Sequence, residues 1–285
     1  QSQKPAPSNG VSQSESLPIV GRSPAMQEIY RIIARLTQTD LTVMIVGESG
    51  TGKELVARAL HDYGRRRKGP FVAVNMAAIP SELIEAELFG HEKGAFTGAR
   101  ESREGLLRSA NGGMLFLDEI GELGADEQAM LLKAIEEKTF YPFGSDRQVS
   151  SDFQLIAGTV RDLRQLVAEG KFREDLFYRL NVFPLTTQNL AQRTDDIIPI
   201  SSILLARHSM VLDDLPSIDD EAADILLAYN WPGNVRELEN VLQRAIVLSY
   251  GGKIMAGDIM VDGAIQERIV KSMTTEMALS KSASA

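Results

Sequence analysis

The sequence predicts an α/β protein in which a parallel β-sheet is flanked by helices and a small all-helical unit follows. Two observations support this prediction. Before about Leu190, short apolar runs alternate with segments of helical periodicity, and this alternation is typical of a parallel sheet with helices on its faces. After Leu190 the strand-like runs stop and helical segments follow one another.

Four short apolar runs are expected to form the strands of the sheet. Runs that are rich in Val, Ile, Leu and Phe, with few polar interruptions, are typical of strands covered on both faces. The predicted strands span residues 41–46, 71–75, 114–119 and 153–159.

Helices are expected where apolar residues recur every three or four positions, as Met26, Ile29, Ile33 and Leu36 do. Among the strands, the predicted helices span residues 25–38, 53–63, 80–88 and 125–137. In the second unit they span residues 195–210, 219–230 and 234–249.

These patterns divide the chain into four parts. Residues 1–16 are mostly Ser, Gln, Pro, Gly and Asn and are expected to be a flexible linker, because so few apolar side chains cannot offset the entropy of ordering. Residues 17–189 are expected to form the α/β unit and residues 190–262 the helical unit. Residues 263–285 have weak periodicity and are expected to be a poorly ordered tail.

Composition excludes several classes of protein. The chain has no cysteine and only three scattered histidines, His61, His91 and His208, which removes disulfides, thiol catalysis and Cys/His zinc sites. Any metal must therefore bind to oxygen. A net charge of -9 disfavours DNA binding by this chain alone. Because no apolar run is long enough to span a membrane and the N-terminus lacks a signal pattern, a cytoplasmic protein without membrane contact is expected.

The strongest motif is glycine-rich and joins the predicted strand 41–46 to the predicted helix 53–63. Its residues are Gly47, Glu48, Ser49, Gly50, Thr51, Gly52, Lys53 and Glu54. Glycines let successive N–H groups and the helix N-terminus face an anion, and Lys53 can reach the outer phosphates of a nucleotide. Glu54 replaces the Ser or Thr that holds magnesium in the common pattern. An ordinary glycine-rich turn is the alternative, and the flanking strand and helix favour nucleotide binding.

A second motif places two acids at the end of the predicted strand 114–119. In a parallel sheet the carboxyl ends of the strands form the ligand edge. Asp118 is placed to hold magnesium, and Glu119 to orient or deprotonate a water that attacks the terminal phosphate. A solvated turn is the alternative for the acid pair alone, and its combination with the phosphate loop favours an ATPase site.

A third motif is a loop with glycines on both sides of an aromatic residue. Its residues are Gly94, Ala95, Phe96, Thr97, Gly98 and Ala99. An exposed Phe96 needs a partner to cover it, whereas the alternative is a turn in which Phe96 packs inside.

With these motifs, the chain resembles the central AAA+ domain of bacterial enhancer-binding proteins, the NtrC-like activators of RNA polymerase that contains sigma-54. The loop 94–99, preceded by ELFGHEKG, decides for this family, and the resemblance covers about Leu17 to Asp262. It implies a P-loop AAA+ fold with a helical lid, ATP and Mg²⁺ as cofactors, with Asp118 and Glu54 as metal ligands, and a loop 94–99 that contacts sigma-54. In this family Glu is common at the position of Glu54.

The resemblance also implies roles for single polar residues. Asn75 matches an asparagine that holds the catalytic glutamate away from water, with a strand-end cap as the alternative. Arg173 and Arg179 match arginine fingers, which reach the γ-phosphate of a neighbouring subunit; salt bridges to Glu174 or Asp175 are the alternative. Fingers that act between subunits imply a ring, usually a hexamer.

Further matches concern the nucleotide and the lid. Arg236, in the stretch WPGNVREL, matches the residue of the lid that reaches the nucleotide. Ile19 and Val20 match residues that pack on adenine, and a hydrophobic start of the first helix is the alternative. Thr159 ends the strand that reports on the γ-phosphate.

The chain departs from the family pattern at two further places. Val160 stands where Asn or His is common, which predicts slower catalysis or weaker coupling. The stretch 186–197 keeps Arg193 and Asp196 but loses much of the usual Pro- and Arg-rich pattern, which puts the hinge to the lid in question.

Three functions are therefore considered. The first is an ATP-driven ring that activates sigma-54 polymerase, and the second is a regulator that binds nucleotide without turnover, which Val160 favours. The third is a P-loop kinase or another AAA+ machine, which the loop 94–99 disfavours. Family members usually add a sensory domain, often of a two-component system, and a helix-turn-helix; the chain is expected to be the isolated central domain.

Overall fold

The computed structural model describes residues 19–209, 215–250 and 252–261. The predicted linker, residues 1–16, and the predicted tail, residues 263–285, lie outside the described residues, as do Leu17 and Asp262 at the expected ends of the two folded units.

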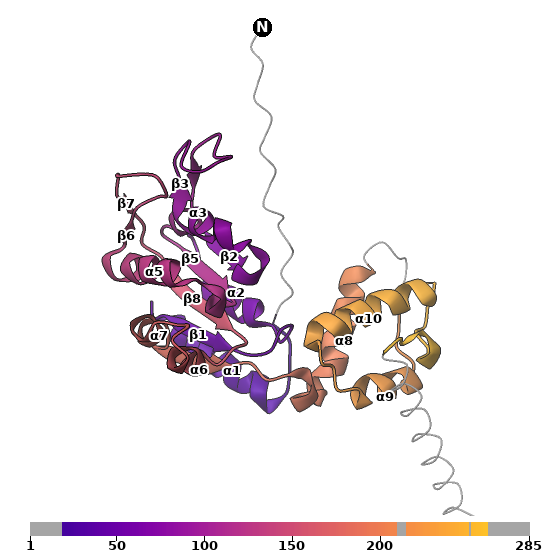
Figure 1. Cartoon of the computed structure of the whole chain (residues 1–285). Coiled ribbons are helices and arrows are strands. Elements are labelled where there is room, and N and C mark those ends of the chain that lie inside the picture. The colour runs from indigo at the N-terminus through magenta and orange to yellow at the C-terminus, as the bar shows by residue number, and fades with distance from the viewer. Residues whose placement is uncertain (1–18, 210–214, 251, 262–285) are drawn as a thin grey trace, which may run out of the picture.

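A five-stranded parallel sheet lies at the centre of the larger unit (Figure 1). Its strand order is β2-β5-β8-β1-β9. The strands are β1 (Val43–Val46), β2 (Phe71–Asn75), β5 (Met114–Asp118), β8 (Gln154–Thr159) and β9 (Phe183–Thr186). The first four confirm the predicted strands, whereas β9 was not predicted. It is short and contains Pro184, which cannot donate to a neighbouring strand and is tolerated because β9 lies at the edge of the sheet.

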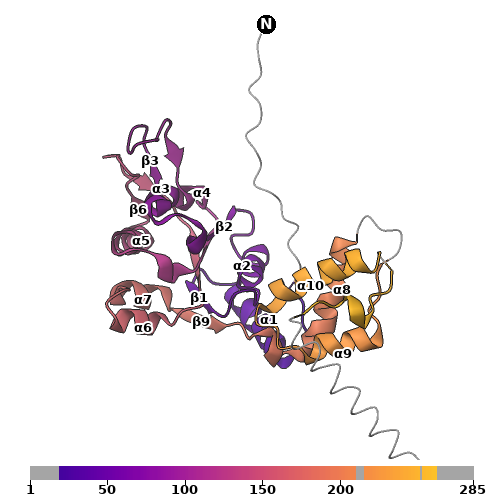
Figure 2. The same cartoon turned by 45° about the vertical axis from the view of Figure 1, so that its right-hand side comes forward.

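Helices cover both faces of this sheet (Figure 2). Strand side chains point alternately to the two faces, so Met114 and Phe116 pack with helices α1 and α2, while Leu115 and Leu117 pack with α3 and α5 to α7 on the other face. The helices of this unit are α1 (Pro24–Leu36), α2 (Lys53–Asp62), α3 (Ile84–Phe89), α4 (Leu106–Ser109), α5 (Ala125–Glu137), α6 (Leu163–Ala168) and α7 (Glu174–Leu180).

Two small antiparallel hairpins project from the end of the sheet unit that is furthest from the lid (Figures 1 and 2). One pairs β3 (Gly90–His91) with β4 (Arg103–Glu104), and the other pairs β6 (Thr139–Phe140) with β7 (Val149–Ser150). The Phe143 N–H donates to Gly90 O at 2.8 Å, so the hairpins lie against each other. The sequence patterns did not predict them.

The lid consists of α8 (Ile197–His208), α9 (Asp220–Ala228) and α10 (Asn234–Leu248). The three predicted helices are confirmed, each ending slightly earlier than expected. They share their own apolar core, in which Trp231 is 1 % exposed and donates its indole N–H to Leu226 O at 2.8 Å. No helix in the described ranges is long and apolar enough to cross a membrane.

The segment between β9 and α8 is anchored by a buried ion pair. Asp196 is fully buried and accepts hydrogen bonds from the backbone N–H groups of Arg22 and Ser23, at 2.6 and 2.8 Å, and from the Ser23 hydroxyl. Arg193 lies 3.9 Å from Asp196 and donates to Thr51 O at 2.9 Å. Burial lowers the pKa of Arg193. The two residues that the hinge retains thus join it to α1 and the phosphate loop.

We expect Asp196→Asn to destabilise the fold, because it leaves the buried Arg193 cation without its counter-charge. The free energy of unfolding should fall by about 3 kcal/mol. Urea denaturation followed by circular dichroism measures this loss. Asp195→Asn is the matched control, since Asp195 is exposed and its replacement should change stability by less than about 0.5 kcal/mol. Equal midpoints for the two variants would contradict this account of the hinge.

Candidate functional site

The glycine-rich loop lies at the carboxyl edge of the sheet, between β1 and α2, as predicted. Gly50 and Gly52 have φ angles of 79° and 99°, which glycine adopts at little cost. Gly47 lies so close to Thr187, just after β9, that a Cβ atom there would overlap the Thr187 hydroxyl. The tight turn therefore requires glycine at these positions, and Thr187 is a neighbour that sequence patterns did not identify.

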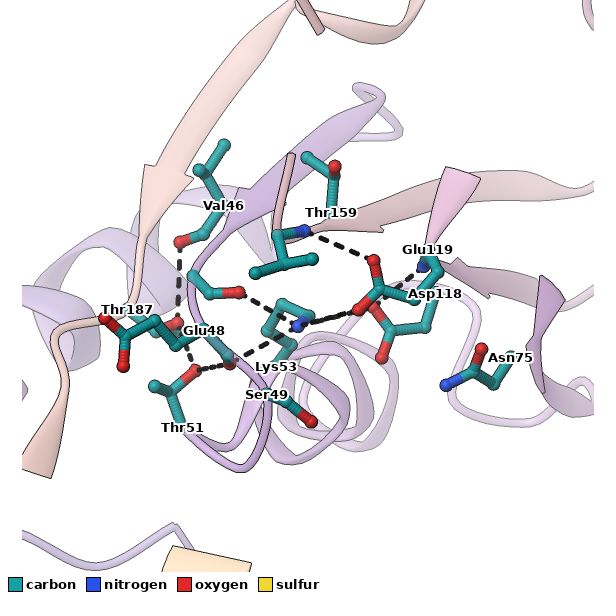
Figure 3. Close-up of polar contacts among 12 residues, drawn as sticks. Val46, Glu48, Ser49, Thr51, Lys53, Asn75, Asp118, Glu119, Thr159 and Thr187 are labelled. Atoms are coloured by element: carbon teal, nitrogen blue, oxygen red, sulfur yellow. Dashed lines mark hydrogen bonds and ion pairs between the residues drawn. The ribbon is translucent and has the colours of Figure 1, made fainter. Parts of the chain in front are cut away.

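Lys53 links the loop to the two acids (Figure 3). Its side chain is only 4 % exposed, and its ammonium group donates to Gly47 O at 3.0 Å and Glu48 O at 3.4 Å. The same Nζ lies 3.6 Å from Asp118 Oδ1 and 3.7 Å from Glu119 Oε1. A buried ammonium group requires such partners. Phosphate oxygens are negatively charged, as the two carboxylates are, so they can also pair with Lys53.

Asp118 and Glu119 occupy the end of β5. Asp118 Oδ1 accepts the Glu119 N–H at 3.0 Å, and a Cβ on Gly158 of β8 would overlap the Asp118 carboxylate. Gly158 therefore makes the space for this acid. Glu119 has φ 54° and ψ 48°, a left-handed conformation that is costly for a residue with a side chain. Its Oε2 accepts the Val160 N–H at 3.4 Å.

Asn75 lies on the far side of the acids from Lys53 (Figure 3). It ends β2, in register with Asp118, and its Oδ1 accepts the Ala77 N–H at 2.9 Å. The side chain thus caps a short 3-10 turn, which is the alternative considered from sequence. Within the described part of the chain no hydrogen bond joins Asn75 to Glu119, so its role in holding Glu119 remains a prediction.

Thr159 is 1 % exposed at the end of β8. Its hydroxyl donates to Arg161 O and accepts the Arg161 N–H, both at 3.0 Å. The neighbouring Val160 presents its backbone N–H, rather than a polar side chain, to Glu119. The contact of Thr159 with nucleotide stays a prediction.

An apolar cleft lies beside the phosphate loop, between the sheet unit and the lid. Ile19 and Val20 line it together with Gly52 and with residues of α1, α2, α8 and α10. The Tyr30 hydroxyl donates to Ile19 O at 3.2 Å and so fixes the start of the cleft. Apolar walls next to phosphate-binding groups suit a planar base, which supports the predicted adenine contacts.

The lid reaches the phosphate loop directly. Arg236 Nη1 donates to Ser49 Oγ at 2.6 Å, so the predicted lid residue lies at the loop that its role requires. Asn234, two residues earlier, also contacts the loop through its side chain, which donates to Glu48 and Ser49.

Arg173 and Arg179 lie on the surface at α7. Arg173 donates to both Asp175 carboxylate oxygens, at 3.0 and 2.7 Å, which is the salt bridge considered as an alternative. Arg179 is exposed and has no hydrogen-bond or ion-pair partner among the described residues. Neither guanidinium contacts Lys53, Asp118 or Glu119 of its own chain.

The loop 94–99 connects β3 to β4 at the tip of its hairpin. Gly94 and Gly98 have φ angles of 81° and 108°, and nothing lies within 4 Å of an added Cβ on either, so the backbone conformation rather than space requires glycine. Phe96 is half-buried. Its ring lies 5.0 Å from that of His91 and 6.2 Å from that of Phe143. Phe96 thus packs on the hairpins and not in the main core.

The donors present fit a magnesium site with one carboxylate. Mg²⁺ bound to nucleotides commonly uses one or two carboxylates and the phosphate oxygens, and Asp118 lies beside Lys53 at the edge where those phosphates would bind. The Glu54 side chain is 56 % exposed and lies 3.5 Å from Arg58, so its metal contact stays a prediction. No group of three or more acidic, His or Cys side chains able to hold a metal occurs among the residues described.

The fold and the site define an α/β phosphate-loop protein with a helical lid. Residues 19–186 match the family described as the sigma-54 interaction domain, and residues 191–273 match the AAA+ ATPase lid domain. The chain belongs to the sigma-54 interaction domain family.

Several relatives span the same region. The chain is 54 % identical over 259 residues to the DNA-binding transcriptional regulator NtrC of Azospirillum brasilense, covering 89 % of this chain and 53 % of the relative. It is 53 % identical over 246 residues to the transcriptional regulatory protein RtcR of Escherichia coli, covering 83 % and 46 %. The chain thus spans about half the length of these curated relatives.

Solved structures of NtrX from Brucella abortus have the same fold. The complex with ATP superimposes with a TM-score of 0.79 at 36 % identity, covering 86 % of this chain and 54 % of NtrX. The complex with ADP gives the same TM-score and identity, covering 85 % and 54 %.

Proposed function

We propose that this chain binds Mg²⁺-ATP at the glycine-rich loop and hydrolyses it, and that hydrolysis drives remodelling of RNA polymerase containing sigma-54. The observation that supports hydrolysis is the position of Lys53 Nζ within 3.7 Å of both acids at the carboxyl edge of the sheet. The NtrX structures with ATP and ADP support the choice of an adenine nucleotide. The family membership supports sigma-54 as the partner.

In this proposal each residue has a separate task. The N–H groups of the loop and the N-terminus of α2 bind the phosphates, and Lys53 neutralises their outer charge. Mg²⁺, when bound at Asp118, supplies further neutralisation of the charge that develops on the leaving phosphate. Glu119 orients the attacking water and takes up its proton. Ile19 and Val20 cover the base.

The arginine fingers require a second subunit. Arg173 and Arg179 are on the surface and do not contact the acids of their own chain, which supports a site that is completed between subunits of a ring, for which the family implies a hexamer. The loop 94–99 is at the end of the sheet unit furthest from the lid (Figure 1), where a partner has access to it. We expect no direct DNA contact by this negatively charged chain and a cytoplasmic location, as for bacterial transcriptional regulators.

Turnover per subunit should rise with protein concentration, because isolated subunits lack a finger from their neighbour. Phosphate release at saturating ATP, measured over a wide range of concentrations, tests this. Mixing Arg179→Ala with Glu119→Gln should then restore part of the activity that each lacks alone, since some interfaces combine an intact acid with an intact finger. A specific activity independent of concentration, with no gain on mixing, would exclude completion between subunits.

A second candidate is a regulator that binds ATP without turnover. It is favoured by Val160, whose side chain is apolar and 47 % exposed and cannot report on the γ-phosphate by a hydrogen bond. Bound ATP with no phosphate release at any concentration would support this second function and reject the first.

A further inference from the structure

Asn234 is a fully buried polar residue that joins three parts of the protein. Its Oδ1 accepts the Leu190 N–H, in the segment that leads to the lid, at 2.8 Å. Its Nδ2 donates to Glu48 Oε2 and to Ser49 O, both in the phosphate loop and both at 3.1 Å. The amide thereby satisfies both of its ends inside the protein, as a buried amide must.

The backbone around Asn234 makes the same connection. The Val235 N–H donates to Gly50 O at 3.0 Å, and a Cβ on Gly50 would overlap Gly233 O. In the loop, the lid thus binds carbonyl groups and the side chains of Glu48 and Ser49. Backbone N–H groups are what a phosphate requires, so these lid contacts and a bound phosphate use different groups of the loop.

Arg236 lies in the same first turn of α10. Its guanidinium reaches Ser49 Oγ, the hydroxyl of the residue whose carbonyl Asn234 holds. The direction of the Arg236 side chain depends on how this turn is positioned against the loop. The side-chain hydrogen bonds of Asn234 fix that position.

We propose that Asn234 is a positioning residue, which locks the start of α10 onto the phosphate loop and the hinge so that Arg236 reaches the phosphates of the bound nucleotide. The inference rests on the proposed function, because it requires that the loop binds ATP. It assigns to Asn234 no contact with the nucleotide itself.

The backbone conformation of Asn234 allows clean substitutions. Its φ is 52°, a left-handed value that Asn and Asp tolerate and Gly adopts freely. Asn234→Asp keeps the acceptor for Leu190 but turns an oxygen toward the Glu48 carboxylate. Asn234→Gly removes every side-chain contact without backbone strain. Asn240→Asp is the matched control, since Asn240 is exposed on the same helix.

The test is equilibrium binding of a fluorescent ATP analogue to the full chain, with kcat and KM measured in parallel. Asn234→Asp and Asn234→Gly should each weaken binding by about tenfold and raise KM more than they lower kcat, whereas Asn240→Asp should bind as the unaltered chain does. In the double variant Glu48→Gln, Asn234→Asp, the amide of residue 48 can donate to the carboxylate of residue 234. This restores their hydrogen bond with donor and acceptor exchanged, and should recover part of the lost affinity.

A double-mutant cycle with Arg236→Ala tests whether Asn234 acts through Arg236. In the Arg236→Ala background, Asn234→Asp should change affinity by less than about twofold. An equal loss in both backgrounds, or unchanged binding by Asn234→Asp and Asn234→Gly, would overturn the proposal. Thermal denaturation checks that Asn234→Asp folds. If it does not fold, the binding measured for Asn234→Gly tests the proposal. Failure of the unaltered chain to bind the analogue would instead overturn the proposed function, and the positioning role with it.

Discussion

Glu119→Gln is expected to abolish ATP hydrolysis while ATP remains bound. The Glu119 side chain is 15 % exposed and is held by Lys53 and by the Val160 N–H. Gln keeps its shape and one acceptor oxygen, so it can retain one of these two contacts. It cannot take a proton from water, so kcat should fall by about 10²- to 10⁴-fold. The loop and Lys53, which bind the phosphates, are unchanged, so affinity for ATP should change little.

Phosphate release and equilibrium binding of ATP, measured on the same samples, separate these two effects. Glu122→Gln is the matched control, since this substitution removes the same charge three residues away. Glu122 pairs with Arg161 at 2.6 Å and not with Lys53. Its turnover should stay close to that of the unaltered chain. Equal turnover by Glu119→Gln and the unaltered chain would reject Glu119 as the base.

The core of the fold was predictable because buried parallel strands are nearly continuous apolar runs. The strand β8, with all of its residues buried, is the clearest case. Strand β9 has only four residues and includes Pro184, so its composition does not differ from that of a loop. The conformation of β9 is decided by its pairing with β1. Such long-range pairing leaves no periodicity in so short a segment.

The same reasoning explains which parts of the candidate site could be predicted. The phosphate loop and the acids each follow a recognisable strand, and the carboxyl ends of parallel strands share one edge, so their meeting at Lys53 could be expected. The role of Gly158 comes from a close contact between two strands, and that of Thr187 comes from a close contact with Gly47 of the phosphate loop. A glycine inside a strand is the signal for Gly158, since it often marks a close approach.

The contacts between lid and loop could not be predicted from spacing. Glu48 and Asn234 are distant in the sequence, and neither belongs to a periodic pattern that indicates their hydrogen bond.

Val160 illustrates a different limit of prediction from the sequence. The sequence shows that its side chain is apolar, but the contact with Glu119 is made by its backbone N–H, which every residue except proline has.

Phe96→Ala is expected to abolish binding to sigma-54 while hydrolysis of ATP continues. The loop 94–99 is at the opposite end of the sheet unit from the lid (Figure 1), so the change leaves the phosphate loop and the acids intact. Aromatic side chains at the centre of an interface often contribute 2 kcal/mol or more, so affinity should fall by at least about thirtyfold. The ring rests on His91 and Phe143 and is only half-buried, so a partner can cover the rest of it.

Binding to purified sigma-54 in the presence of a transition-state analogue of ATP hydrolysis measures this loss, with phosphate release measured alongside. Tyr141→Ala is the matched control, because Tyr141 is an aromatic residue between β6 and β7 that is 42 % exposed. Its ring lies near Lys133, whereas the ring of Phe96 lies against His91 and Phe143. The control should retain binding, since the sigma-54 contact is assigned to the ring of Phe96 and not to exposed aromatic surface in general. Retained binding by Phe96→Ala would show that the contact is made elsewhere, whereas loss of both binding and hydrolysis would mean that the loop supports the ATP site.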